Sequence, residues 1–504
     1  MNLTAVMEAE AFQGGWADDI AFLAGERAVT HAEVHEGAAR TGTLLTRMGV
    51  GRGDRVLIVL PDGPEFAWAF LGAVRIGAVA VPVNPRLTAA DHRAGADDTA
   101  AKVVMCSAEL ASRFQAEVVA GEELESAFSA HPRAAAAAVG AGDAAYAQYT
   151  SGTTGSPKAA VHAHGDPLVY VEAFARPAIA LQRIDVVLSV SKLYFAYGLG
   201  NSLFFPLLTG CRAVLHAAHP RPDETAELIR RHRVTVLFSV PTFYAHLVAG
   251  SHAADMESVR VAVSAGEALG VELAARARSF LGCPILDGLG STEVGQTFAS
   301  NTLDRWKDGT VGTALPPYRV CVRDDGGGAV AAGQVGALWV AGPTLPIGYL
   351  GRPAFPTKDE WLATGDRALL DADGFLHVRG RADDVELVGG ISVTPLEIEA
   401  VLSRHPGVTE VAVAGVVGAD GASRLEAFVV TGSGAASADA LESELLAMAR
   451  LELAPFKVPR TVKLVGALPR TATGKLRRFV LRSGAWPEKP ASGQPRARVP
   501  KRSM

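Results

Sequence analysis

The chain has 504 residues, and at roughly 150 residues per domain this length predicts about two to four structural units. The composition is 49% hydrophobic, so the chain can bury large cores, and a formal net charge of −5 gives no sign of wholesale nucleic-acid binding. The four cysteines stand far apart without C-x-x-C spacing, which argues against a disulfide scaffold or a zinc site and suits a reducing cytoplasm.

Two stretches bear on targeting and on membranes. The N-terminus carries acidic residues and lacks the basic region and apolar run of a signal peptide. Residues 193–211 contain no charged side chain over 19 positions, which is the length of a membrane span. Glycines, Asn201 and Pro206 within this stretch favour packed loops and helices instead, so we expect no membrane partner.

The first part of the chain alternates between strand and helix patterns. A strand followed by a helix is predicted over 26–49, and buried strands are predicted at 55–60, 78–83, 103–105, 186–190, 213–215, 234–240, 259–264 and 284–286. Helices are predicted at 65–76, 203–208 and 224–232, and the alanine run 134–138 is a helix or a connector. Strands and helices that alternate at this spacing predict parallel sheets with crossover helices.

The pattern changes beyond residue 310. Short strands alternate with glycine turns, which predicts a small antiparallel barrel, and a polar junction follows at 380–384. A helix at 395–403, strands at 408–417 and 425–430, and a helix at 440–451 predict a small α/β unit. We therefore expect an N-terminal domain over 1–381, a C-terminal domain over 382–485, and a disordered tail over 486–504 that is rich in Pro, Arg and Ser.

The segment 150–158 has the composition of a loop that wraps a polyphosphate. Its residues are Thr150, Ser151, Gly152, Thr153, Thr154, Gly155, Ser156, Pro157 and Lys158. Glycines let the backbone approach a ligand, successive N–H groups form a concavity for anions, and lysine adds a positive charge. The Walker A pattern is absent, because Gly155 is followed by Ser-Pro-Lys. The alternative is an ordinary surface loop, which this ordered string disfavours.

This ordered string resembles the phosphate loop of the adenylate-forming enzymes, a superfamily of acyl- and aryl-CoA ligases, peptide-synthetase adenylation domains and luciferases. Further motifs in the order of that family extend the resemblance over roughly residues 25–485. The resemblance implies an α/β fold with a large N-terminal domain of two α/β sheet layers plus a small β-barrel. It also implies a small, mobile C-terminal α+β lid domain, hinged near Asp383.

The resemblance implies an ATP site formed from several motifs. The residues it assigns to ATP are Thr150, Ser151, Gly152, Thr153, Thr154, Gly155, Lys158, Gly266, Asp287, Gly288, Leu289, Thr292, Asp366, Arg381 and Lys475. Many members of the family have an aromatic residue at the position of Leu289, where the contact with adenine is here aliphatic. Asp366 can accept from both ribose hydroxyls, although a Thr-Gly-Asp sequence is in isolation a plain turn.

Three residues carry the chemistry that the resemblance implies. Thr292 follows a strand end and can donate to a phosphate, and Glu293 offers an oxygen ligand for Mg²⁺. Lys475 resembles the lid lysine that neutralises charge as the acyl-adenylate forms. The alternatives are a helix start for the Thr-Glu pair and a surface position for Lys475. Gly389 and Gly390 resemble the stretch along which the pantetheine arm of CoA lies, although family members often have Ser or Lys nearby.

The acyl pocket resembles that of the benzoate-CoA ligase group more than that of fatty acyl or acetyl ligases. The segments 191–201 and 287–293 carry this likeness, and the implied pocket residues are Phe195, Ala196, Tyr197, Gly266, Gly290, Gln296 and Thr297. Aromatic walls with glycine gaps suit a flat ring. The chain departs from the group at Gln296 and Thr297, where benzoate ligases have His and an aliphatic residue. We therefore expect a hydroxyl or amino group on the ring, or a longer pocket.

The predicted function is that of an ATP-dependent aryl-carboxylate CoA ligase that forms an aryl-AMP intermediate and releases AMP and pyrophosphate. The predicted cofactors and co-substrates are ATP, Mg²⁺ and coenzyme A. Two alternatives stay open: loading of the phosphopantetheine thiol of a carrier protein, and a non-catalytic nucleotide-binding role. We expect no nucleic-acid partner, and the oligomeric state stays open between a monomer and a homodimer.

Overall fold

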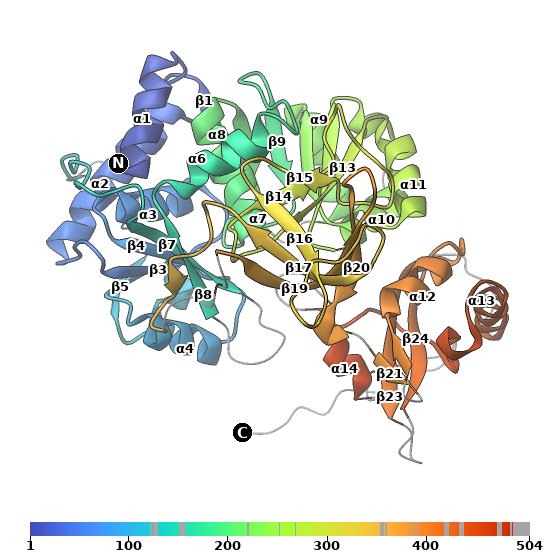
Figure 1. Ribbon diagram of the computed structural model, residues 1–504. Coiled ribbons are helices and arrows are strands. Elements are labelled where there is room, and N and C mark those ends of the chain that lie inside the picture. Colours follow the sequence, from blue (N-terminus) through green and yellow to red (C-terminus); the bar gives the residue numbers. More distant parts are fainter. Residues whose placement is uncertain are drawn as a thin grey trace. The chain divides into compact units, whose positions relative to one another are not determined.

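The computed structural model describes residues 1–120, 123, 126, 130–150, 158–218, 221–250, 253–267, 269–352, 357, 360–384, 386–388, 391–417, 423–432, 438–470, 476–483 and 486. The chain forms two compact units, Met1–Val378 and Arg379–Met504 (Figure 1). The domain boundaries expected after residues 381 and 485 remain predictions. The tail over 486–504 lies outside the described residues except for Trp486, whose Nε1 donates to the carbonyl of Ala467 at 2.8 Å.

Two large sheets form the framework of the first unit. The seven-stranded sheet has the order β18-β8-β7-β4-β3-β5-β6, and the nine-stranded sheet has the order β15-β14-β13-β12-β11-β9-β10-β1-β2. The first comprises β3 (Arg55–Val59), β4 (Val79–Pro82), β5 (Val103–Cys106), β6 (Glu117–Ala120), β7 (Ala144–Thr150), β8 (Lys158–Ala163) and β18 (Gly348–Tyr349). The second comprises β1 (Ile20–Ala24), β2 (Arg27–Thr30), β9 (Val186–Ser189), β10 (Arg212–Leu215), β11 (Val236–Ser239), β12 (Val261–Ser264), β13 (Ile285–Gly290), β14 (Thr297–Ser300) and β15 (Thr313–Ala314).

Helices cover the faces of these sheets. They are α1 (Leu3–Gln13), α2 (His31–Arg47), α3 (Pro64–Arg75), α4 (Ala89–Thr99), η1 (Ala108–Arg113), α6 (Asp166–Tyr170), η2 (Val171–Ala175), α7 (Ala196–Leu199), η3 (Gly200–Phe204), α8 (Phe205–Thr209), α9 (Pro222–His232), α10 (Pro241–Gly250), η4 (Ala253–Met256) and α11 (Val271–Leu281). Thr30 starts α2 with a capping box, because its hydroxyl accepts from Glu33 N while the Glu33 carboxylate accepts from Thr30 N. The sequence analysis missed α1, whose buried Leu3, Met7 and Ala11 form one narrow apolar stripe.

Alternation along the strands divides the core. One cluster of buried residues, called the central cluster here, includes Phe66, Phe70 and Phe204. On β3, Ile58 belongs to this central cluster and Leu57 belongs to a separate cluster, since neighbouring strand residues face opposite sides of the sheet. On β11, Phe238 joins the same central cluster while Leu237 packs with the residues of α9, α10 and α11. Helices α2, α3 and α8 contribute to the central cluster, so they lie between the two sheets. The predicted α/β architecture with two sheet layers is therefore confirmed.

Three segments differ from, or refine, the expectation. The strands β16 (Arg319–Arg323), β17 (Gly336–Ala341), β19 (Leu362–Leu370) and β20 (Leu376–Arg381) form a four-stranded sheet in the order β16-β17-β19-β20, in which the described strands do not close into a barrel. Glycine turns specify antiparallel neighbours, but closure also requires the first strand to pair with the last. The alanine run 134–138 is a connector without regular structure, and the apolar stretch 193–211 contains the short helical segments α7, η3 and α8.

The second unit combines a small sheet with helices. Its elements are η5 (Ala382–Asp384), β21 (Glu386–Val388), β22 (Ile391–Val393), α12 (Pro395–Leu402), β23 (Val408–Val417), β24 (Ser423–Thr431), α13 (Ala438–Glu452), η6 (Pro455–Lys457), β25 (Thr461–Leu464) and α14 (Arg478–Arg482). The sheet has the order β23-β24-β25, and β21 and β22 form a separate hairpin. Apolar residues of α12, α13 and the three-stranded sheet form its core. The small α/β unit predicted from the sequence is confirmed.

Two arginines tie the last helix of the second unit to its first residues. Arg478 Nε lies 3.6 Å from Asp384 Oδ1, and Arg482 Nε donates to Glu386 Oε1 at 2.8 Å. Just before α14, Arg470 and Leu476 pair as an isolated antiparallel bridge. Both ends of the segment 471–475 are therefore anchored within this unit.

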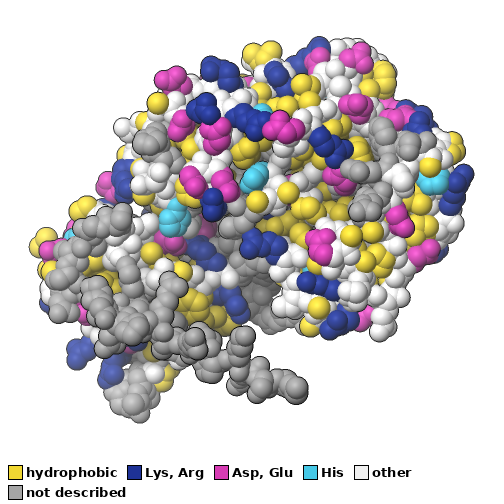
Figure 2. Space-filling model, turned by 180° about the vertical axis from the view of Figure 1, so that it is seen from behind, with side chains coloured by type: hydrophobic (Ala, Val, Ile, Leu, Met, Phe, Trp, Pro, Cys, Tyr) yellow, Lys and Arg dark blue, Asp and Glu magenta, His cyan; other side chains and the backbone are white. Residues whose placement is uncertain are grey.

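Charges are mixed on the face of the molecule shown in Figure 2. Lys and Arg side chains alternate there with Asp and Glu side chains instead of gathering in one patch. Among the described helices, none has both the length and the apolar character needed to cross a membrane.

Candidate active site

The base of the predicted phosphate loop is a tight antiparallel pair. Strand β7 ends at Thr150 and β8 begins at Lys158, and these two residues lie directly opposite each other. Ser151, Gly152, Thr153, Thr154 and Gly155 lie outside the described residues. The pairing fixes both ends of the intervening loop and leaves Lys158 half-buried at its exit.

Thr292 and Glu293 lie in a turn that follows β13. Ser291 closes this turn, because its Oγ accepts from Val294 N at 3.2 Å and its carbonyl accepts from Gly295 N at 2.9 Å. Gly295 has a φ of +87°, and a Cβ there would lie 1.9 Å from Tyr170 Oη. Only glycine fits this position, and Thr292 and Glu293 are held half-exposed.

Tyr349 links this turn to the phosphate loop, and the sequence analysis did not identify it. The Tyr349 hydroxyl donates to Glu293 Oε1 at 3.3 Å, and Lys158 Nζ lies 5.4 Å from the centre of the Tyr349 ring. Burial and the Glu293 charge raise the pKa of Tyr349, so the hydroxyl stays protonated. Strand β18 is only two residues long and pairs with β8, so no periodic pattern marked it.

The predicted adenine residues lie at the carboxyl ends of parallel strands. Asp287 is one of them, and its neighbours across β11 and β12 are Ser239 and Ser264, which the sequence analysis did not name; all three are buried. Ser239 Oγ, Ser264 Oγ and Asp287 Oδ1 make no hydrogen bond of ordinary geometry within the described part of the chain, although the Ser264 hydroxyl lies close to the Asp287 carboxyl. Burial raises the pKa of Asp287 well above its usual value, which favours the protonated form of the carboxyl. This polar row can pair with the donors and acceptors of a planar base.

The remaining predicted adenine positions surround that row. Gly266 follows β12 with a φ of +89°, and the nearest atom to a Cβ there would be Val240 Cγ1 at 3.7 Å. Gly288 and Leu289 continue β13 and pair with Ser300 and Ala299 of β14.

The other predicted nucleotide and thiol residues are placed less completely. Asp366 lies half-buried on β19, where its N–H donates to Thr364 Oγ1 at 3.1 Å. Arg381 ends β20, and the backbone of Asp383 lies in η5. Lys475, Gly389 and Gly390 lie outside the described residues. The assigned roles of these six residues remain predictions.

The predicted acyl pocket brings together two polar segments that are distant in the sequence. Tyr197 and Asn201 are four residues apart on the helical run α7–η3, so they share one face. Gln296 meets this run at Gly200, where a Cβ would lie 1.8 Å from Gln296 Nε2. Thr297 N and Oγ1 both donate to Gln296 Oε1, at 3.0 and 3.2 Å, which fixes the amide so that its Nε2 points toward Gly200.

These pocket residues include polar atoms without partners. Tyr197 Oη, both amide atoms of Asn201 and Gln296 Nε2 are buried; Tyr197 and Asn201 lie close enough to interact weakly, but none of these atoms makes a hydrogen bond of ordinary geometry in the described structure. Burial raises the pKa of Tyr197. Buried polar groups are costly unless paired, so unpaired ones beside each other mark a place for a polar ligand group.

The rest of the predicted pocket is aromatic or lacks side chains. The Phe195 ring packs edge-on against Tyr194 with centres 4.6 Å apart, and the Tyr197 ring packs against Phe238 at 6.1 Å. Ala196 begins α7 beside Phe195. A Cβ on Gly290 would lie 2.8 Å from the carbonyl oxygen of Gln296, so this strand end must be glycine for the turn to fold back on it.

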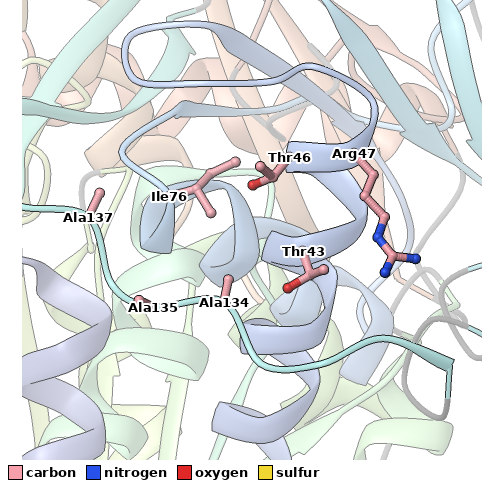
Figure 3. Close-up of a pocket in the computed structure, with 7 residues that line it drawn as sticks. All are labelled: Thr43, Thr46, Arg47, Ile76, Ala134, Ala135 and Ala137. Carbon is pink, nitrogen blue, oxygen red and sulfur yellow. The ribbon is translucent and has the colours of Figure 1, made fainter.

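A surface pocket of about 350 Å³ lies elsewhere (Figure 3). Its lining residues are Thr43, Thr46, Arg47, Ile76, Ala134, Ala135 and Ala137. The helix α2 and the connector that contains the alanine run provide most of this lining. None of the candidate site residues belongs to it, so it is separate from the site described here.

The fold and site define an adenylate-forming enzyme. The family model described as AMP-binding enzyme matches residues 9–350, and that of the AMP-binding enzyme C-terminal domain matches residues 397–475. The chain therefore belongs to the AMP-binding enzyme family, and the resemblance inferred from its motifs is confirmed.

Aryl-acid ligases are among its relatives. The p-hydroxybenzoic acid–AMP ligase FadD22 of Mycobacterium tuberculosis is 43% identical over 492 residues, which cover 97% of this chain and 70% of that protein. The benzoate–CoA ligase of Thauera aromatica is 38% identical over 476 residues, which cover 90% of each chain. The crystal structure of a benzoate CoA ligase from Burkholderia xenovorans LB400 matches with a TM-score of 0.89 at 36% identity, covering 96% of this chain and 100% of that one.

Proposed function

We propose that this protein is an ATP-dependent aryl-carboxylate ligase. The carboxylate attacks the α-phosphorus of ATP, so that an aryl-AMP anhydride forms and pyrophosphate leaves. A thiol then attacks the carbonyl carbon, and AMP leaves as the thioester forms. The observation that carries this proposal is the contact of Tyr349 with both Lys158 and Glu293, which joins the phosphate loop to the turn after β13.

The donor set at that turn fits Mg²⁺. Glu293 offers a half-exposed carboxylate beside the base of the phosphate loop, and Thr292 offers a hydroxyl. Mg²⁺ is typically held by one or two carboxylates together with substrate phosphates and water, so a larger protein cage is not needed. When bound, the ion would neutralise charge on the phosphates. Lys475 is our candidate for the cation that assists adenylation, with Asp366 and Arg381 for the ribose.

We infer further that the aryl ring carries a polar substituent. Tyr197, Asn201 and Gln296 present buried polar atoms that a hydroxyl or amino group could pair with. A site built to pair with a hydroxyl rejects the analogue that lacks it. The relatives include a ligase named for p-hydroxybenzoic acid, which supports this inference. If plain benzoate were used far more efficiently than every hydroxy- and aminobenzoate, the inference would fail.

The thiol has two candidates. We propose coenzyme A, with Gly389 and Gly390 along its path and the segment near Asp383 as the hinge between the two half-reactions. The second candidate is the phosphopantetheine arm of a carrier protein, because the relative with 43% identity is named as an AMP ligase and the one with 38% identity as a CoA ligase.

The test is to measure pyrophosphate and AMP release with Mg·ATP across benzoate, hydroxybenzoates, aminobenzoates, cinnamate and a medium-chain fatty acid, with and without CoA. Turnover of one aryl acid to aryl-CoA would support the ligase proposal and identify the ring. Acid-dependent pyrophosphate exchange without an aryl-CoA product would favour the carrier protein. If none of these acids supports pyrophosphate exchange, the proposal is contradicted.

We also place the enzyme in the cytoplasm. All four cysteines are free thiols, and Cys106, Cys211 and Cys283 are buried. Burial raises the pKa of Cys106 to about 11, so its thiol stays protonated and unreactive. Free thiols of this kind suit a reducing compartment.

A further inference from the structure

His162 connects the strand that leaves the phosphate loop to the turn after β13. It lies on β8, four residues beyond Lys158, and it is fully buried. Its Nε2 lies 2.8 Å from the carbonyl oxygen of Thr292, which is 130 residues away in the sequence. A carbonyl oxygen can only accept, so Nε2 carries a proton and donates it to this bond.

The other side of the imidazole is also held. Nδ1 lies 3.2 Å from Asp166 Oδ2, which additionally accepts from Ala163 N at 3.0 Å. The Tyr170 hydroxyl lies 3.4 Å from Nδ1, and the Tyr146 ring stacks on the imidazole with centres 5.1 Å apart. A histidine whose second nitrogen and ring face are fixed has a defined orientation, so its Nε2 has one direction in which to donate.

A second hydrogen-bond chain holds the far side of Glu293. Thr344 Oγ1 donates to the carbonyl of Val294 at 2.8 Å, and Tyr318 Oη lies 2.9 Å from Thr344 Oγ1. Since the Thr344 proton is committed to Val294, the tyrosine is the donor of the second bond. The carbonyls on both sides of Glu293 are therefore clamped by buried side chains.

We propose that His162 is a positioning residue for the metal and phosphate site. Through the Thr292 carbonyl it fixes the Thr292 hydroxyl and the Glu293 carboxylate relative to the strand that begins at Lys158. This inference rests on the proposed roles of Thr292 and Glu293 in binding Mg·ATP. Mg²⁺ demands near-ideal octahedral geometry at short distances, so a small shift of one carboxylate weakens it strongly.

The test compares two substitutions of His162 with a matched control. His162→Leu keeps the volume and removes the donor, whereas His162→Gln returns an N–H near the position of Nε2. His164→Leu is the control, because His164 is equally buried on the same chain segment and accepts from Leu3 N instead of contacting the turn. ATP is titrated calorimetrically into each full-length protein, once with Mg²⁺ and once with EDTA, and without any acid.

The measured quantity is the factor by which Mg²⁺ tightens ATP binding. We expect His162→Leu to lower this factor at least fivefold, and His162→Gln and His164→Leu to stay within twofold of the wild type. A folded His162→Leu protein with an unchanged factor would overturn the proposal, as would an equal loss in His164→Leu.

Two further outcomes are decisive. If His162→Leu does not fold, Thr344→Val tests the same clamp from the other carbonyl, and an unchanged factor there overturns the proposal. Wild-type protein that binds no ATP in either condition would overturn the proposed function itself. By contrast, if the wild type binds Mg·ATP and the His162→Leu variant binds it equally well, only the positioning role of His162 is overturned.

Discussion

Two regions of the first unit differ in how their buried polar groups are paired. Behind the turn 291–295, His162, Tyr170 and Thr344 are joined in continuous hydrogen-bond chains that end on backbone carbonyls. In the predicted acyl pocket, Asn201 is fully buried and Tyr197 is half-buried, and the buried Tyr197 Oη and the Asn201 amide atoms make no hydrogen bond of ordinary geometry among the described residues. The comparison separates polar groups that pair within the protein and stabilise its framework from a cluster of unpaired groups that we propose pairs with a ligand.

The largest effect is expected from breaking the framework at Gly295. Gly295→Leu forces a side chain into the space of Tyr170 Oη, 1.9 Å from the new Cβ, at a φ of +87°. We expect adenylation to fall by about 100-fold, since a misplacement of about 1 Å can cost that much. Acid-dependent pyrophosphate exchange measures this loss.

The control for this substitution is Gly25→Leu. Gly25 also has a positive φ, of +62°, but no atom lies within 4 Å of a Cβ there. It therefore tests backbone strain alone. An equal loss of exchange in both variants would show that the contact with Tyr170 is irrelevant.

The substitution Gln296→Leu tests whether the unpaired groups of the predicted acyl pocket contact the substrate. Removing the unpaired Nε2 should lower kcat/KM for hydroxybenzoates by about 10- to 100-fold relative to benzoate, because a buried hydroxyl then lacks a partner. Competition between the two acids for one enzyme measures the ratio directly. An unchanged ratio would mean that Gln296 does not contact the substituent.

Three buried histidines that are not among the candidate site residues connect burial with the pH dependence of stability. Burial lowers the pKa of His31, His35 and His164 to about 4, so all three are neutral in the folded protein at pH 7. The unfolded chain binds their protons below pH 6.5, so stability should fall as the pH drops from 6.5 to about 4 and then level off. The slope is at most about 1.4 kcal/mol per histidine and pH unit.

Urea unfolding at pH 7.0, 5.5 and 4.5 tests this expectation. His35→Gln should flatten the decline, because one of the three titrating groups is gone. A stability that stays constant from pH 7.0 to 4.5 would contradict the expected titration.

The smallest effect is expected from a matched pair of tyrosines. Tyr170→Phe removes a hydroxyl that lies 3.0 Å from Tyr146 Oη and should cost about 1 kcal/mol of unfolding free energy. Tyr197→Phe removes an unpaired buried hydroxyl and should be neutral or slightly stabilising. Chemical denaturation of the two variants without ligand measures the difference. If both variants lost the same stability, the two regions would not differ in the way described.

Motifs were readable from the sequence because they are local. The string from Thr150 to Lys158 and the Thr292-Glu293 pair each occupy consecutive positions. Strand and helix patterns predicted parallel sheets with crossover helices, and the family resemblance implied the two sheet layers that the structure has. Gln296 and Thr297 were identified because they depart from the family pattern, and the structure places Gln296 against the helical run that carries Tyr197.

The long-range contacts that position the candidate site residues could not be predicted from the sequence. Tyr349 and Glu293 are 56 residues apart, and His162 and Thr292 are 130 residues apart. Each pair meets only after strands from different parts of the chain have taken their register, and a single tyrosine or histidine carries no periodic signal. The described strands β16, β17, β19 and β20 form an antiparallel sheet as expected, but they do not close into a barrel, since closure depends on pairing between distant strands.

The ties between α14 and the first residues of the second unit have a mechanical consequence. Arg478 and Arg482 hold Asp384 and Glu386, and the Arg470–Leu476 bridge anchors the segment that contains Lys475. We therefore expect α14 and the Arg470–Leu476 bridge to move with η5 and β21 as one rigid body whenever backbone dihedrals upstream of Asp384 change.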